Sequence, residues 1–309
     1  MNCENKTRDS ASLESKRLPG FVPLALFVGV LSISFAAIFF RKAQPTDPLV
    51  SAGIRLAVAA LVLSPFFIRS IKNKKVNARL LKHAVLAGLA YGLHFGSWVT
   101  SLMLTSVAAS VTLVTTTPLL LALVAVITGK DRPGKRWWFS LGLAFVGLLL
   151  IGGGDVLDSQ TLKGDALALF GACAMASYLI IARRLGRELD VWAFSFVACA
   201  VGASLLLGSA CALGVPIAPA SGEALIYIVL AALLPQLVGH NLLTWSMKHT
   251  TPAIAGIAIL GEPVGAAILG WLWLGETVSG LVIVGCALTL FAVGLAVLNM
   301  RSRQIAAHT

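Results

Sequence analysis

The stretch that decides the fold is HTTPAIAGIAILGEPVGAAILGWLWLG, residues 249–275, with a single carboxylate, Glu262, at its centre. Thirteen residues without Asp, Glu, Lys or Arg lie on either side of Glu262, and Lys248 and Glu276 mark the two ends. About 20 apolar residues span the hydrocarbon core of a bilayer, so this stretch predicts a transmembrane helix with Glu262 near the midplane. An ionisable group at that depth costs ~3 kcal/mol on insertion scales. We therefore expect it to face a cavity, a partner or a permeation path.

The composition of the whole chain is that of an integral membrane protein. Of its 309 residues, 58% are hydrophobic and 12% are charged, whereas soluble domains have about 45–50% apolar and 25% charged residues. The mean hydropathy is +0.89. The net charge of +11 falls in short clusters between apolar runs rather than on one domain face, so nucleic acid is not an expected partner. The five cysteines form no CxxC pair and predict no disulfide framework.

Apolar runs between charged residues predict ten transmembrane helices in an all-α protein. The run from 83 to 129 contains no Asp, Glu, Lys or Arg and is too long for one helix, so we divide it at a turn near Leu104 and Thr105. Another turn is predicted at 214–219, which contains one glycine and two prolines. The expected helices cover residues 20–40, 48–68, 83–102, 105–128, 137–152, 164–182, 191–213, 223–245, 251–274 and 279–299.

The distribution of positive charge predicts the orientation of these helices. If the N-terminus is cytoplasmic, twenty of the 24 Lys and Arg residues fall in cytoplasmic segments and three fall in outer loops. Loops rich in Lys and Arg remain in the cytoplasm. Both termini are therefore expected to be cytoplasmic, with polar tails at residues 1–19 and 300–309.

The two halves of the chain repeat at an offset of 145 residues, at which Pro118 matches Pro263 and several small residues also match. The proline match carries the most weight, because proline inside a span removes a backbone hydrogen bond. The expected repeats are residues 20–152 and 164–299. Each holds five spans, an odd number, so the second copy must be inverted in the membrane. Inverted repeats are typical of secondary transporters, whose site lies near the midplane between the halves.

Several motifs of this chain form a family pattern. The second half contains Leu260-Gly261-Glu262-Pro263 and then Leu274-Gly275-Glu276-Thr277, the first half contains Thr117-Pro118-Leu119-Leu120, and Arg55 lies early in the second expected helix. From residue 21 to 299 the chain resembles the EamA-type transporters of the drug/metabolite transporter superfamily. The resemblance implies two inverted five-helix domains around a cavity lined mainly by spans three, four, eight and nine. One departure is Gly129-Lys130-Asp131-Arg132, where members often have Gly-Glu, which weakens any role for Asp131.

Glu262 has a functional and a structural interpretation. Small residues share its helix face, which permits either close helix packing or an open wall beside the carboxylate. A desolvated carboxyl favours its neutral form, so Glu262 could bind substrate or exchange a proton as access alternates. Its structural role would be a hydrogen bond to a backbone carbonyl that Pro263 leaves free.

Arg55 also has two interpretations. It lies about seven residues into its helix, or roughly 10 Å deep at 1.5 Å per residue. From that depth its side chain can snorkel to the outer surface or pair with another helix. Alternatively, its guanidinium fork suits a bidentate contact with a substrate carboxylate.

The third expected helix presents Tyr91, His94 and Trp98 on one face at helical spacings. Aromatic rings with polar tips suit a cavity that accepts partly polar ligands, and they equally suit a bundle core. Gly88 and Gly92 form a GxxxG step on the adjacent face, which predicts close contact with a neighbouring helix.

The eighth and fourth expected helices add further polar residues. Gln236 and His240 lie four positions apart and need partners or water at membrane depth. Thr116 belongs to a threonine cluster before Pro118, whose hydroxyls satisfy freed carbonyls or line the cavity. His94 and His240 have no carboxylate or cysteine at ligand spacing, so no metal or cofactor site is predicted.

These features predict a multi-pass inner-membrane secondary transporter that moves a small metabolite by alternating access. Export, and an amino acid or related substrate, follow from the resemblance alone. Protons are the candidate coupling ion, the lipid bilayer is the surrounding partner, and a homodimer is a candidate assembly. An intramembrane enzyme is the first alternative, but the chain has no HExxH or GxSxG motif and no second mid-membrane acid. A channel or sensor is the other alternative, which the sequence leaves open.

Overall fold

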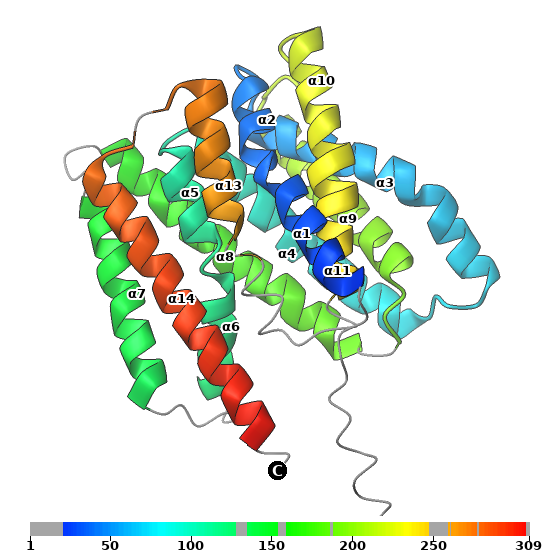
Figure 1. Ribbon diagram of the computed structural model, residues 1–309. Coiled ribbons are helices and arrows are strands. Elements are labelled where there is room, and N and C mark those ends of the chain that lie inside the picture. Colours follow the sequence, from blue (N-terminus) through cyan, green and yellow to red (C-terminus); the bar gives the residue numbers. More distant parts are fainter. Residues whose placement is uncertain are drawn as a thin grey trace, which may run out of the picture.

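The computed structural model describes residues 21–127, 135–153, 159–185, 188–246, 259, 261–276 and 278–306. The described part is built from helices and their connections (Figure 1). The first half contains α1 (Phe21–Ser34), α2 (Ala36–Lys42), α3 (Pro48–Lys72), α4 (Ala78–Leu102), α5 (Val107–Val114), α6 (Thr117–Ile127) and α7 (Lys135–Gly153). The second half contains α8 (Ser159–Leu185), α9 (Val191–Ala212), α10 (Gly222–Ala231), the π-helical segment η3 (Ala232–His240), α11 (Asn241–Ser246), α13 (Gly261–Leu269), the π-helical segment η4 (Gly270–Leu274) and α14 (Gly280–Ala306).

Each expected span corresponds to a helix or to a series of consecutive helices. The predicted turn at Leu104 and Thr105 is confirmed, because it separates α4 from α5. The predicted turn at 214–219 is also confirmed, between α9 and α10. The expected tail at 300–309 is helical as far as Ala306, since α14 continues past the predicted end of the tenth span. The expected tail at 1–19 and the first part of the ninth span lie outside the described residues.

Four spans that were predicted as continuous helices are interrupted. The first is broken at Phe35, and the fourth is broken at Thr115 and Thr116. The eighth contains η3, with Pro235 inside it, and the ninth changes from α13 to η4. Proline lacks the N–H that an α-helix needs at that position, and π-helical turns accommodate such defects. The sequence runs without charged residues indicated the lengths of the spans, but they did not predict these local breaks.

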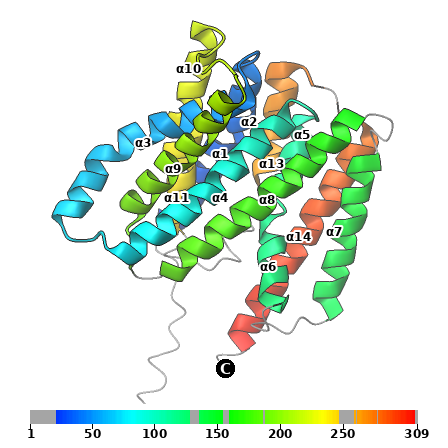
Figure 2. The same ribbon diagram turned by 180° about the vertical axis from the view of Figure 1, so that it is seen from behind.

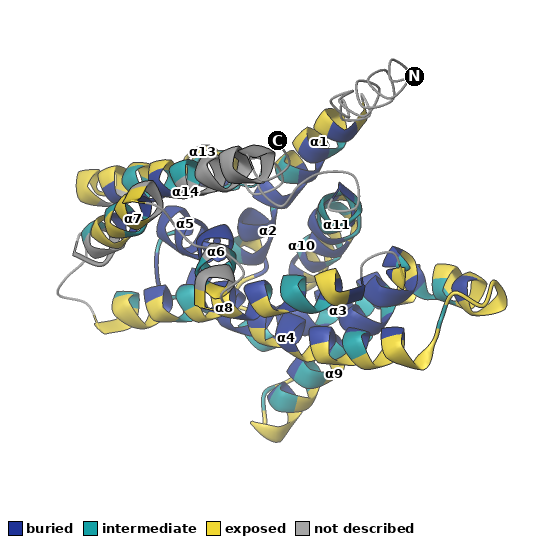
Figure 3. Ribbon diagram, turned by 90° about the horizontal axis from the view of Figure 1, so that it is seen from below, coloured by how far each residue is buried: buried dark blue, intermediate teal, exposed yellow. Residues whose placement is uncertain are grey.

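Five of the described helical segments are long and apolar enough to cross a membrane. They are Phe21–Lys42, Pro48–Lys72, Ser159–Leu185, Val191–Ala212 and Gly222–Ser246. Large apolar side chains lie on the outside of the bundle, among them Phe139 and Phe145, while buried residues turn toward its centre (Figure 3). An apolar exterior of this kind suits a lipid environment.

The two halves are interleaved rather than separate. α3 packs on α9, α4 packs on α8 and α9, and α1 packs on η3, α11 and α13 (Figure 2). α7 and α14 lie side by side and run in opposite directions (Figure 1). If each span is replaced by its counterpart in the other half of the chain, nearly the same pairs of spans remain in contact. The contact of α4 with α8, for example, corresponds to the contact of η3 with α1. Two inverted repeats would give this arrangement.

The glycine face of α4 allows the close approach of α9. A Cβ atom at Gly88 would lie 2.7 Å from Cβ of Val201, and one at Gly92 would lie 3.2 Å from Cα of Gly202. The close helix contact predicted from the GxxxG step is therefore confirmed. With this face against α9, the neighbouring face of α4 turns its aromatic side chains into the protein.

Candidate functional site

A cavity of about 100 Å³ lies at the junction of the two halves. Its walls come from both halves of the chain. The first half contributes residues that include Ile33, His94, Trp98, Thr115, Thr117 and Pro118. The second half contributes residues that include Met175, Tyr178, His240, Thr244, Ile259 and Glu262.

The structure divides the residues that the sequence singled out into two groups. Five of them line the cavity: His94, Trp98, Pro118, His240 and Glu262. The other five lie outside its lining among the described residues: Arg55, Tyr91, Thr116, Gln236 and Pro263. Residues from four spans are thus brought together, and the second group packs around them.

Glu262 stands in the first turn of α13, where its side chain reaches the cavity and is half-buried. α13 is held against α1, because Ser34 Oγ donates to the backbone oxygen of Glu262 at 3.4 Å. Gly265 permits this approach, since a Cβ atom there would collide with Ser34. Among the described residues the carboxylate has no hydrogen-bond partner. The carbonyl contact expected from the structural interpretation is not formed within that part of the chain.

His94 is buried on α4, and its ring is fixed by a bond to the opposite helix. Nδ1 lies 2.9 Å from the backbone oxygen of Gly171 in α8. A carbonyl oxygen can only accept, so Nδ1 carries the proton. In the neutral ring Nε2 is then an acceptor. The lone pair of the neutral His94 ring is therefore on Nε2, and the residue is part of the cavity lining.

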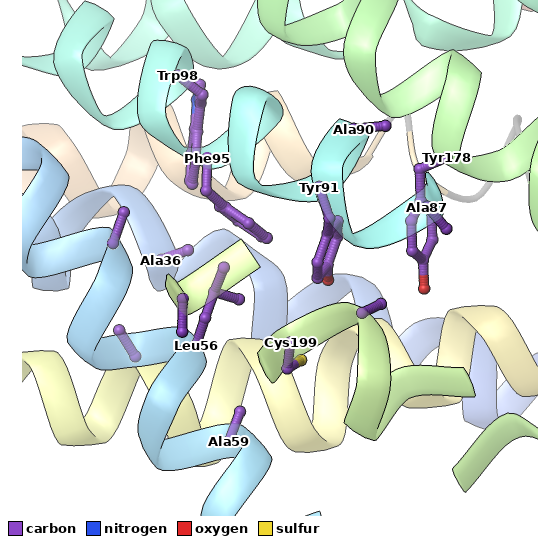
Figure 4. Close-up of a cluster of buried hydrophobic side chains, with 14 of the residues drawn as sticks. Ala36, Leu56, Ala59, Ala87, Ala90, Tyr91, Phe95, Trp98, Tyr178 and Cys199 are labelled. Atoms are coloured by element: carbon purple, nitrogen blue, oxygen red, sulfur yellow. The ribbon is translucent and has the colours of Figure 1, made fainter. Parts of the chain in front are cut away.

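Tyr91 forms a supporting layer beside the cavity rather than part of its wall. Its hydroxyl accepts a bond of 2.8 Å from Nε2 of Gln236 in η3. Its ring stacks on Tyr178 of α8, with centroids 4.5 Å apart (Figure 4). The predicted aromatic face of α4 is thus divided: Tyr91 joins three spans, whereas His94 and Trp98 face the cavity.

Arg55 is fully buried in α3, so the snorkelling conformation expected from its depth is not adopted. Its guanidinium carbon lies 4.2 Å from the ring centroid of Phe95 and 5.4 Å from that of Phe40. Such cation–π contacts stabilise a desolvated guanidinium. None of its three side-chain nitrogens has a hydrogen-bond partner among the described residues.

The threonine cluster bonds to the backbone around the break in the fourth span. Thr115 donates to Val111 O at 2.6 Å, and Thr116 donates to Leu113 O at 2.7 Å. Thr117 donates to Val114 O at 2.9 Å. The hydroxyls therefore satisfy carbonyls near the interrupted helix.

An ion pair that the sequence did not single out joins the halves at one end of the bundle. Arg41 Nη2 lies 3.1 Å from Glu276 Oε1 and donates to Thr105 O at 2.7 Å. Glu276 Oε2 also accepts from the backbone N–H of Val107, at 3.0 Å. We call Arg41, Thr105, Val107 and Glu276 the clasp. It joins α2, the α4–α5 turn and the segment after η4.

Gly275 is the sequence feature from which the clasp could have been predicted. It adopts φ 66°, a left-handed conformation that favours glycine, and it ends η4. This turn brings Glu276 back to the N-terminus of α5, where a carboxylate is electrostatically favoured. Asp131, its counterpart in the repeat, lies outside the described residues.

The cavity and the clasp lie at different parts of the fourth span. α5 begins at the clasp, whereas the cavity-lining residues of the fourth span, from Val114 to Leu121, lie at and beyond the break at its other end. Leu243 and Thr244 line the cavity from α11. None of the four clasp residues is among the cavity-lining residues that the structure describes, so the clasp joins the halves away from the cavity.

Comparisons with known proteins agree with this architecture. The threonine/homoserine exporter RhtA of Salmonella typhimurium is 29% identical over 311 residues, covering 94% of this chain and 97% of the relative. RhtA of Escherichia coli K12 is 29% identical over 282 residues, covering 85% and 87%. The uncharacterized inner membrane transporter YedA of Escherichia coli K12 is 25% identical, covering 82% of each chain. A protein crystal structure with 18% identity has a TM-score of 0.62, covering 90% of this chain and 97% of its own, which supports the fold alone.

The profile of the EamA-like transporter family matches residues 21–153 and again residues 162–298. The members of that family are multi-pass membrane transporters and not enzymes, so the intramembrane-enzyme alternative is excluded. Because the two matches cover both halves of a chain whose helices enclose a central cavity, the protein belongs to the EamA-like transporter family.

Proposed function

We propose that the protein is a secondary active transporter that exports a small polar metabolite, an amino acid or a close relative of one. The observation that carries the proposal is the cavity between the halves, which both line with polar side chains and into which Glu262 projects. Ligand sites of inverted-repeat transporters lie at this position. The names of the relatives, threonine/homoserine exporters, support the direction and the substrate class.

The proposed cycle alternates access to the cavity from the two ends of the bundle. In this conformation the clasp holds one end together, away from the cavity. The Lys and Arg distribution favours an outer position for the clasp, with the cavity facing the cytoplasm. Substrate would enter from the cytoplasm, and its release outside would require Arg41 and Glu276 to separate.

Glu262 is the proposed coupling residue or substrate contact. A carboxylate at membrane depth without a hydrogen-bond partner among the described residues is costly unless a cation, a proton or a substrate compensates it. A substrate ammonium group or a proton from outside would each supply that compensation at a different stage of the cycle. Protons are accordingly the proposed coupling ion.

The test compares extracellular metabolites of cells that express the wild type, Glu262→Gln or Glu223→Gln at matched membrane abundance. Glu223 is the control, because it is an exposed carboxylate in the first turn of α10 and lies outside the cavity lining. We expect one amino acid class to accumulate outside cells with the wild type and Glu223→Gln. Glu262→Gln should lower this accumulation at least tenfold.

Each other outcome has a distinct meaning. Equal export by all three proteins would make Glu262 structural and refute its coupling role. No change in the medium with the wild type would refute export. Vesicles loaded with the exported compound then separate a carrier from a channel, because only a carrier gives saturable uptake that unlabelled substrate on the other side accelerates.

A further inference from the structure

The end of the bundle where α3 leads into α4, and where α8 ends, has a strongly basic surface. The basic residues described there are Arg69, Lys72, Lys74, Lys75, Arg79, Lys82, Arg183 and Arg184. Two carboxylates lie among them and are already paired. Asp190 Oδ2 lies 3.9 Å from Lys75 Nζ, and Glu188 Oε1 lies 2.7 Å from Arg79 Nη1. The other basic residues of this surface form no ion pair within the described part of the chain.

The connection between α3 and α4 is fixed against the start of α9. Asp190 caps α9, because its carboxylate accepts from the backbone N–H of Ala193 at 3.0 Å. The same carboxylate accepts from Ser70 Oγ, near the end of α3, also at 3.0 Å. With the Lys75 contact, these bonds hold the end of α3 in one position. The basic residues that surround it therefore extend from a backbone whose place is set.

Lys74 occupies a backbone position that ordinarily belongs to glycine. α3 ends in a Schellman motif, in which the N–H of Lys75 donates to Ser70 O at 3.0 Å and the N–H of Lys74 donates to Ile71 O at 2.9 Å. Lys74 has a φ of 55°, and a side chain in this left-handed region costs free energy that glycine would not. The exposed lysine is therefore present at a cost to the turn, which points to a use of its ammonium group outside the fold.

Exposed aromatic rings adjoin these cations. Phe66 of α3 and Trp192 in the first turn of α9 are 43% and 46% exposed, and their rings stack with centroids 4.9 Å apart. Phe66, Arg69 and Lys72 follow at intervals of three residues, so they lie along one side of α3. Tryptophan is enriched where the bilayer meets water. The surface thus passes from aromatic to cationic along one helix, as a phospholipid passes from acyl chain to headgroup.

We propose that this surface binds an anionic phospholipid, with the headgroup at Arg69, Lys72 and Lys74 and the acyl chains along Phe66 and Trp192. The expected orientation places this end at the cytoplasmic leaflet, whose surface is negatively charged. A zwitterionic lipid has the same phosphate, but it also has a cation that opposes the unpaired basic residues. The surface should therefore prefer an anionic headgroup. This inference goes beyond the proposed transport function and does not depend on it.

The test measures the binding of phosphatidylglycerol and phosphatidylcholine with the same acyl chains to the purified protein in detergent, by native mass spectrometry. The proteins are the wild type, Lys72→Gln with Lys74→Gln, and the control Lys42→Gln with Lys163→Gln. The control also removes two exposed lysines, one at the end of α2 and one near the start of α8. We expect the wild type and the control to prefer phosphatidylglycerol. The first double variant should lower this preference at least tenfold, because each Lys near an anionic surface contributes about fivefold.

Lys74→Gly separates lipid binding from folding. It removes the charge and relieves the left-handed conformation, so the melting temperature in detergent should stay the same or rise. The preference for phosphatidylglycerol should nevertheless fall about fivefold. If Lys74 served only the turn, the melting temperature would fall and the lipid preference would not change, which would contradict the proposal.

Trp192→Ala tests the apolar part of the site against the control Trp271→Ala, whose indole is exposed on η4. Trp192→Ala should weaken the binding of both lipids and leave their ratio unchanged, because the ring contacts acyl chains rather than headgroups.

Three results would overturn the inference. The first is equal binding of the two lipids to the wild type, and the second is an equal loss of preference in the two double lysine variants. The lysines would then serve only to orient the protein in the membrane. The third is displacement of phosphatidylglycerol by inorganic phosphate at the same concentration, which would indicate a site for a free anion. None of these measurements involves transport, so each result leaves the proposed function as it stands.

Discussion

The charged groups of the clasp are paired with each other, whereas charged and polar groups beside the cavity are not. In the clasp, the guanidinium of Arg41 and the carboxylate of Glu276 lie 3.1 Å apart, and each also bonds to the backbone. Beside the cavity, the guanidinium of Arg55 and the indole N–H of Trp98 are buried without a hydrogen-bond partner among the described residues. Paired charges hold one end of the bundle together. Burying polar groups without partners carries a cost in free energy that the paired charges of the clasp avoid.

Of the effects predicted here, the largest is expected from breaking the clasp. Glu276→Lys places a second cation beside Arg41 and removes the acceptor of the Val107 N–H. Charge-assisted hydrogen bonds contribute about 1.5–3 kcal/mol, and every 1.4 kcal/mol is tenfold, so opening of this end should rise at least tenfold. The reporter is Ala43→Cys, a fully buried position two residues after Arg41, in a chain whose native cysteines are replaced by serine. Its reaction with an impermeant maleimide should accelerate by the same factor.

The charge swap is the control for that prediction. Arg41→Glu combined with Glu276→Arg restores opposite charges at the same positions, and labelling should return toward the wild-type rate. Equal labelling rates in all three proteins would show that the clasp does not hold this end closed.

The next effect concerns the helix contact that orients the cavity wall. Gly88→Ala places a Cβ atom 2.7 Å from Val201, so α4 or α9 must shift. Overpacking of this kind costs about 1–3 kcal/mol and should lower the melting temperature in detergent. Gly142→Ala on α7 is the control, because a Cβ atom there meets nothing within 4 Å. Similar losses in both variants would contradict the close α4–α9 contact.

A smaller effect is expected for the paired layer beside the cavity. Tyr91→Phe removes the acceptor of the Gln236 amide, and hydrogen bonds between membrane helices contribute about 0.6–1.7 kcal/mol. The double variant with Gln236→Leu removes both partners and should recover part of this loss of stability. Additive losses in thermal unfolding would show that the two side chains do not stabilise each other.

The smallest effect is expected from the substitution of two neighbouring threonines, of which one lines the cavity. Thr116 lies outside the cavity lining and Thr117 lies within it, although both hydroxyls bond to backbone carbonyls. Thr116→Val should cost less than ~1 kcal/mol and leave the KM for transport within about twofold of the wild-type value. Thr117→Val should change the KM more than Thr116→Val does. A larger change of the KM in Thr116→Val than in Thr117→Val would contradict the assignment of Thr117 to the cavity lining.

The sequence predicted the features that depend on residues close to one another in the chain. It predicted the positions of the spans as far as the described residues test them, the turn at Leu104 and Thr105, and the close contact at the Gly88 face. It also indicated that His94, Trp98, His240 and Glu262 belong to one region. These predictions succeed because a bilayer imposes length and apolarity on every span, whatever its partners are.

The sequence predicted less well where the partner of a residue decides its role. Helical spacing placed Tyr91 on the same face as His94 and Trp98, yet Tyr91 bonds to Gln236 and does not line the cavity. The depth of Arg55 suggested snorkelling, but Phe40 and Phe95 hold its guanidinium inside the bundle.

By itself, then, the sequence determined a multi-pass helical membrane protein with two related halves and an isolated carboxylate at membrane depth. Only the tertiary structure decided which polar groups are paired and which face the cavity, and it alone brought Arg41 to Glu276 across the two halves. The physical reason is that helical periodicity sets the angle between residues of one helix, whereas the rotation of that helix against its neighbours depends on contacts between residues far apart in the chain.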